Sequence, residues 1–163
     1  MSKFIALVLG IAGGVIGSQA PGFTLQYMQN LAGRVDQLEQ LVQEFDESVG
    51  RYGFTRQQAL GECAVADGLL DALCDGYEKT VRDYLDLSEH LAELRAAPDL
   101  KRPLTLAMDH RPQIVESVTQ EFKPAVPTTI DGAVYAGGGM AVLWGGFTGL
   151  WALISVPFRR RSA

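Results

Sequence analysis

The chain has 163 residues, of which 47% are apolar and 20% are charged, and its formal net charge at pH 7 is −5. These values fit one modest domain combined with a small number of membrane spans. The acidic balance argues against nucleic-acid binding, which needs a basic surface.

The first apolar run, residues 4–20, contains no charged side chain. Its length is at the short end of the range that crosses a bilayer, and we predict a transmembrane helix there. The alternative is a cleaved signal peptide, because Ser18, Gln19 and Ala20 form an acceptable cleavage site. Retention of the run as a membrane anchor is favoured, because a signal peptide usually begins with several basic residues and Lys3 is the only one before the run.

Residues 22–128 form the predicted middle domain. Apolar residues recur at alternating steps of three and four from Met28 to Tyr52, and again from Leu70 to Leu94. This spacing predicts two long helices that pack as an antiparallel hairpin. The residues expected at the core of the hairpin are Leu38, Val42, Phe45, Tyr84, Leu87 and Leu91.

The connection between the two long helices carries three signals. Gly53 fits the C-terminal stop of the first helix. Thr55 and Gln58 fit a capping box, which predicts a short helix beginning there. A further break is expected between residues 61 and 68, before the second long helix.

Cys63 and Cys74 are the only two cysteines. On one continuous helix they would be about 16 Å apart, beyond the bridging limit of roughly 7 Å between Cα atoms. A disulfide therefore requires the chain to turn between them, near Asp67 and Gly68. We predict this disulfide for an oxidising compartment, with two buried thiols as the alternative.

Residues 98–128 contain five prolines, which leave room for one short helix at about residues 112–122. Four apolar side chains precede it: Leu100, Leu104, Leu106 and Met108. They either cover the base of the hairpin or lie in the membrane interface. We favour the first reading, because apolar residues more commonly serve as core.

The second apolar run, residues 132–157, also lacks charged side chains and is long enough to cross about 30 Å of hydrocarbon. The basic tail 158–163 follows, and its arginines favour the cytoplasmic side of a membrane. Between the two runs lie nineteen acidic and ten basic residues, a net charge of −9. We therefore expect both termini in the cytoplasm and the middle domain outside it.

Small residues recur at every fourth position in both apolar runs. Such ladders allow membrane helices to pack closely, within one chain or between chains. The first ladder is Ala6, Gly10, Gly14 and Ser18, and the second ladder is Gly137, Ala141, Gly145 and Gly149. Neither run contains Asp, Glu, Lys, Arg or His, which argues against an ion pathway or a proton relay.

Two patterns are weak candidates for chemistry. Asp67, Asp71 and Asp75 line one helical face, for which a solvated surface is favoured over a cation site. His110 stands beside Asp109, but no nucleophile motif accompanies the pair. We therefore predict no catalytic residue, no metal site and no cofactor.

Two segments carry a resemblance to a known family: GSQAPGFTLQYMQNLAGRVDQLEQLVQEFD near the start, and FKPAVPTTIDGAVYAGGG with the terminal PFRRR. The chain resembles an uncharacterised family of proteobacterial inner-membrane proteins, known only as a domain of unknown function. The resemblance implies a two-span bacterial inner-membrane protein. It brings no activity, cofactor or catalytic residue.

The expected function is that of a non-enzymatic inner-membrane protein. Its periplasmic hairpin would act as a self-associating scaffold or as an accessory subunit of an envelope membrane complex. The expected partners are membrane lipid and either other membrane proteins or further copies of the chain. The alternative is a periplasmic small-ligand sensor module that signals through a partner.

Overall fold

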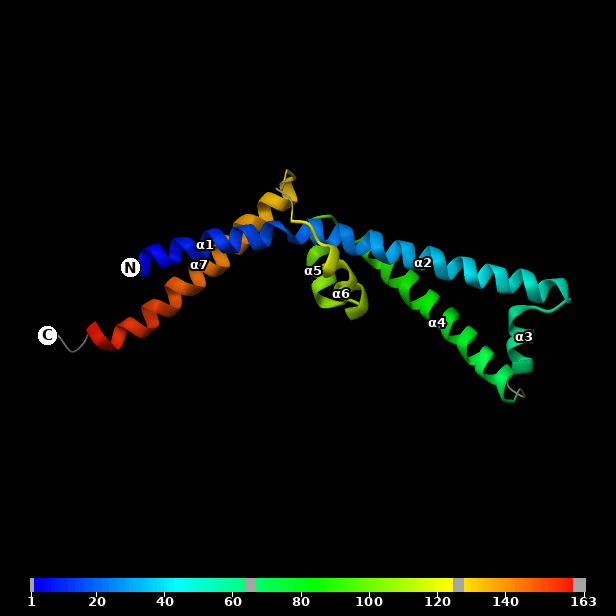
Figure 1. Cartoon of the computed structure of the whole chain (residues 1–163). Helices are drawn as coiled ribbons and strands as arrows, with labels where there is room; N and C mark the ends of the chain where they lie inside the picture. Colours follow the sequence, from blue (N-terminus) through cyan, green and yellow to red (C-terminus); the bar gives the residue numbers. More distant parts are fainter. Residues whose placement is uncertain (1, 64–66, 125–127, 160–163) are drawn as a thin grey trace. The chain divides into compact units, whose positions relative to one another are not determined.

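The structure of the chain is a computed structural model, and it describes residues 2–63, 67–124 and 128–159. It is 86% helical, and the described residues contain no strand. The helices are α1 (Ser2–Ser18), α2 (Ala20–Arg51), α3 (Arg56–Cys63), α4 (Leu69–Ala96), α5 (Arg102–Met108), α6 (Pro112–Glu121) and α7 (Ile130–Arg159) (Figure 1). The predicted all-α class is confirmed.

The chain divides into two units, which are described separately. Unit 1 comprises Met1–Tyr27 and Ala97–Ala163, and unit 2 comprises Met28–Ala96, so the division falls within α2. Two helical stretches, Lys3–Arg51 and Ile130–Ser155, are long and apolar enough to cross a membrane. Part of the predicted basic tail, residues 160–163, lies outside the described residues.

In unit 1, α1 passes into α2 almost without interruption. Gln19 alone separates the two helices; its N–H donates to the carbonyl of Ile16 (3.1 Å), and the N–H of Phe23 donates to the carbonyl of Gln19 (2.9 Å). Pro21 falls in the first turn of α2, where the missing N–H of proline leaves no helical bond unmade. The side chains therefore change here from the apolar residues of α1 to the mixed polar and apolar residues of α2, whereas the helical backbone continues.

Two short helices, α5 and α6, follow in the second part of unit 1. Helix α6 lies at the predicted position and buries Ile114 and Val118. Helix α5 was not predicted, because the prolines were interpreted as breaks. Pro103 instead lies in the first turn of α5, which is the position in a helix that proline favours.

Two tyrosine hydroxyls anchor the segments around α5. The fully buried Tyr27 accepts a hydrogen bond from the backbone N–H of Arg111 at 2.9 Å, immediately before α6. The hydroxyl of Tyr135, in the second turn of α7, donates to the carbonyl of Leu100 at 2.8 Å. Both ends of α5 are thereby connected to long helices of unit 1.

The expectation that the apolar residues around α5 serve as core is correct only for Leu106. Leu100, Leu104 and Met108 are exposed, Met108 to 88%, whereas Leu106 is buried. Leu106 is two positions from both Leu104 and Met108, which places it about 160° around the helix from them. Helix α5 therefore buries one face and presents an apolar stripe on the other.

Unit 2 contains the predicted connection. Helix α2 ends at Arg51, and the N–H groups of Gly53 and Phe54 donate back to the carbonyls of Gly50 and Val49 (3.0 and 3.1 Å). Gly53 has a φ of 79°, which glycine adopts without steric cost. This pair of bonds is a Schellman motif, so the predicted helix stop is confirmed.

Helix α3 begins with the predicted capping box. The N–H of Thr55 donates to Oε1 of Gln58 (2.9 Å), and the N–H of Gln58 donates to Oγ1 of Thr55 (3.3 Å). These reciprocal bonds satisfy two N–H groups that a helix start otherwise leaves without a partner.

Helices α2 and α4 run in opposite directions in unit 2 (Figure 1). Of the six residues predicted at their core, Val42 and Leu91 are buried, and the other four are half-buried. The buried face of α4 was predicted to begin at Leu70, but Leu70 and Leu73 are exposed. The first buried residue of α4 is Cys74.

Candidate functional site

Helices α1 and α7 approach each other closely, backbone against backbone. A Cβ atom added to Gly13 would lie 2.9 Å from the carbonyl carbon of Gly139 and nearer still to its oxygen. Gly17 is packed in the same way against the backbone of Tyr135 and Gly139. The two helices run antiparallel, so the start of α1 and the end of α7 lie at the same end of the pair (Figure 1). The backbones approach this closely because Gly13 and Gly17 of α1 and Gly139 of α7 have no side chains.

The first predicted ladder lies in this contact. All four of its residues are buried; Gly10 faces Trp144, and Gly14 faces Ala136 and Met140. Gly13 and Gly17 make the tightest contacts of α1, although neither belongs to the predicted ladder. They belong to a second row on the same face of α1, one position before the ladder residues.

The second predicted ladder does not lie at the close backbone contact between α1 and α7, and its packing role stays a prediction. Gly137, Ala141, Gly145 and Gly149 are exposed, and a Cβ added to any of the three glycines would meet nothing within 4 Å. Gly137 and Ala141 are each two positions from Gly139, which is about 160° around the helix. The face that contacts α1 carries large side chains, Met140, Leu143 and Trp144. Large residues of α7 therefore pack over small residues of α1, a pairing that a search for small residues alone does not find.

One end of unit 2 is closed by a disulfide. Cys63, the last residue of α3, is bonded to Cys74 in the second turn of α4, and their Cα atoms are 5.7 Å apart. The chain turns between them, and Gly68 has a φ of 64° immediately before α4. Residues 64–66 of the expected break lie outside the described residues.

Two side-chain contacts support the same end of unit 2. The rings of Phe45 and Tyr77 are stacked with their centroids 3.6 Å apart, which connects α2 to α4. Arg56 holds Asp46 through both carboxylate oxygens, and the Nε–Oδ1 distance is 2.7 Å. Burial raises the pKa of the Tyr77 hydroxyl. The hydrogen bonds from Arg56 lower the pKa of the Asp46 carboxyl.

The Asp46–Arg56 pair predicts a limited acid sensitivity of unit 2. Because the folded-state pKa of Asp46 is lowered, the pair stabilises the fold above the unfolded pKa of about 3.9 and loses this effect as the pH falls further. The side chains are 35% and 39% exposed, so solvent screening limits the contribution to about 1 kcal/mol or less. Asp46→Asn should remove this part of the pH dependence when unit 2 stability is followed by hydrogen exchange from pH 5 to pH 3. Arg56→Gln should have the same effect; if it does not, another group causes the pH dependence.

Helices α5 and α6 form a groove with the junction of α1 and α2, all within unit 1. The groove has a volume of about 400 Å³. Its apolar walls include Ile16, Ala20 and Phe23 on one side and Leu106, Val115 and Phe122 on the other. Phe23 and Phe122 contact each other edge to face, with ring centroids 5.5 Å apart. We call this feature the junction groove; its size is within the range of about 300–1,000 Å³ of small-molecule sites.

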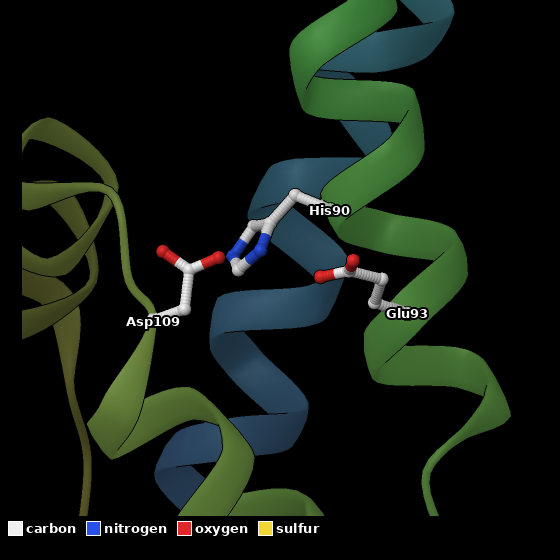
Figure 2. A group of neighbouring side chains, drawn as sticks. All are labelled: His90, Glu93 and Asp109. Atoms are coloured by element: carbon white, nitrogen blue, oxygen red, sulfur yellow. The ribbon is translucent and has the colours of Figure 1, made fainter.

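The titratable residues singled out from the sequence do not form a catalytic arrangement within a unit. The carboxylate of Asp109 accepts from Nη1 of Arg111 at 2.8 Å, and His110 is exposed. His90 and Glu93 project from one turn of α4 (Figure 2), and His90 is buried. Within either unit taken by itself, the described residues place no three potential metal ligands together.

The acidic row at the start of α4 is exposed. Asp67, Asp71 and Asp75 face solvent, and Glu78 forms an ion pair with Arg82 one turn later at 3.2 Å. This is the arrangement of an outer helical surface. It offers no enclosed position for a cation among these residues.

Comparison with known proteins gives one match that covers nearly all of the sequence. Residues 1–160 match the family described as "Protein of unknown function (DUF2937)". No curated protein and no solved structure matches the chain. The chain therefore belongs to the DUF2937 family.

Proposed function

We propose that this protein is a non-enzymatic inner-membrane protein with two spans, α1 and α7, and a periplasmic helical hairpin in unit 2. It acts as a self-associating scaffold or as an accessory subunit of an envelope membrane complex. Both termini are cytoplasmic in this proposal, in agreement with the antiparallel course of α1 and α7.

Membrane insertion is supported by the outward faces of the two helices. Phe4 and Ile16 on α1, and Val142 and Leu153 on α7, are each about 70% exposed. A continuous apolar surface of this kind is rare on a soluble monomer and fits contact with lipid. The disulfide between Cys63 and Cys74 supports an oxidising compartment for unit 2.

The observation that carries the proposed association is the orientation of the second ladder. Helix α1 contacts α7 most closely at Gly139 and Leu143, whereas nothing lies within 4 Å of the Cβ positions of the ladder glycines. A small-residue row of this kind lets a further membrane helix approach closely. We therefore place the contact with a partner, or with a second copy, along Gly137, Ala141, Gly145 and Gly149.

The test is the effect of Gly145→Leu on the native mass of the gently extracted protein. If the ladder forms the interface, a leucine there should weaken association by about tenfold, which corresponds to roughly 1.4 kcal/mol. Gly146→Leu is the matched control, because Gly146 is adjacent, also has nothing within 4 Å, and lies 100° further around the helix.

Identification of the proteins in the extracted assembly distinguishes the two versions of the proposal. A homo-oligomer indicates a scaffold, and a defined set of other membrane proteins indicates an accessory subunit. A bare monomer from native membranes, or equal effects of the two leucine substitutions, would contradict the proposal.

A further inference from the structure

We propose that the junction groove binds one acyl chain of a membrane phospholipid. The inference rests on the proposed membrane insertion of α1, and it assigns a ligand to a part of the molecule that helix association does not use. The groove walls are largely apolar, and Ile16 connects them to the exposed apolar surface of α1.

The walls favour an apolar ligand. Among the described residues that line the groove there is no Asp, Glu, Lys or Arg, and His110 is the only titratable side chain among them. Two further polar residues, Gln19 and Thr24, already bond within the chain. Nε2 of Gln19 donates to Oγ of Ser18 (2.9 Å), and Oγ1 of Thr24 donates to the carbonyl of Ala20 (2.8 Å).

These internal bonds disfavour a strongly polar ligand, because they use polar hydrogens that such a ligand would need. A sugar or a charged solute placed in the groove would lose water without gaining matching partners, which is costly. A hydrocarbon chain has no such requirement, and its burial against Phe23, Leu106 and Phe122 is favourable. The groove is thus suited to an alkyl chain rather than to the periplasmic solute of the alternative function.

The source of the chain follows from the course of α1. Ile16 lines the groove and is also 69% exposed on the outer surface of the apolar run. The groove wall therefore continues, within one turn, into a surface that faces lipid when α1 spans the membrane. An acyl chain can enter from the surrounding bilayer without crossing water. His110 is exposed, so the groove is open to the aqueous side at that residue.

The experiment uses the full chain in liposomes that contain a phospholipid with a diazirine in the middle of one acyl chain. After irradiation, the labelled peptides are identified by mass spectrometry over a range of probe fractions. We expect saturable labelling of peptides that cover residues 16–24 and 103–122. Labelling of the outward face of α7, around Leu153, should rise in proportion to the probe.

Two variants fill the groove from different walls. Ala107→Phe on α5 and Val115→Phe on α6 should each abolish the saturable labelling. Ala152→Phe is the matched control, because it places the same side chain on the exposed surface of α7, away from the groove, and should leave the labelling unchanged. Circular dichroism and the intact disulfide establish that each variant is folded.

The outcomes separate this inference from the function on which it rests. The acyl-chain site would be overturned if labelling of the groove rose in proportion to the probe fraction. It would also be overturned if both phenylalanine variants kept the saturable labelling. In either case, label on α7 would still show that the protein is inserted in the membrane. Absence of label on α7 would overturn membrane insertion and the acyl-chain site together.

Discussion

Replacement of Gly13 with alanine should separate α1 from α7. The added methyl group would meet the backbone carbonyl of Gly139, and a backbone cannot move away by changing a rotamer. Overpacking of this kind costs about 1–3 kcal/mol. The measurement is oxidative cross-linking of Gly10→Cys with Trp144→Cys, because the Cβ positions of these residues are 3.2 Å apart. The cross-linked fraction should fall strongly in the Gly13→Ala background.

The neighbouring glycine provides the control. A Cβ on Gly14 would be 3.4 Å from the carbonyl oxygen of Ala136, which is ordinary van der Waals contact. Gly14→Ala should therefore preserve the cross-link. Equal cross-linking in the Gly13→Ala and Gly14→Ala proteins would show that the backbones of α1 and α7 do not approach as closely as the structure places them.

Removal of the disulfide should produce the largest loss of stability in unit 2. The bond closes a loop between residues 11 positions apart, and a loop of this size contributes about 2–4 kcal/mol, chiefly by restricting the unfolded chain. The double variant Cys63→Ser with Cys74→Ser should therefore show faster amide exchange in α3 and α4. Peptides from α1 and α7 provide the internal reference.

Reduction of the unmodified protein gives an independent comparison. A thiol reductant should bring its α3 and α4 exchange to the rate of the double variant, and it should not change the double variant itself. Unchanged protection after either treatment would mean that the ring stack of Phe45 and Tyr77 is sufficient to hold this end of unit 2.

The local features of unit 2 were predictable because they depend on neighbouring residues. Gly53 ends α2 and Thr55 caps α3, each through hydrogen bonds that span only a few positions. The start of the apolar pattern in α4 was less predictable. Leu70 and Leu73 have the right spacing, but the bond to Cys63 turns Cys74 inward.

The contacts of unit 1 were harder to predict because they depend on residues distant in sequence. Two ladders of similar spacing do not reveal that α7 presents Gly139, Met140 and Trp144 to α1 in place of its ladder residues. Pro103 was interpreted as a break, although proline is also compatible with the first turn of a helix. The junction groove forms where α5, α6 and the end of α1 meet. The spacing of apolar residues within each helix does not predict which helices meet.

The pairing of α1 with α7 also has a consequence for biosynthesis. The ribosome adds about 5–20 residues per second, and Gly13 is synthesised well before Gly139. Helix α1 is therefore complete on the order of ten seconds before its contact residue in α7 is synthesised. During that interval the small-residue face of α1 has no partner from its own chain. In the proposed two-span protein, a foreign membrane helix would therefore compete most effectively for this face before α7 is synthesised.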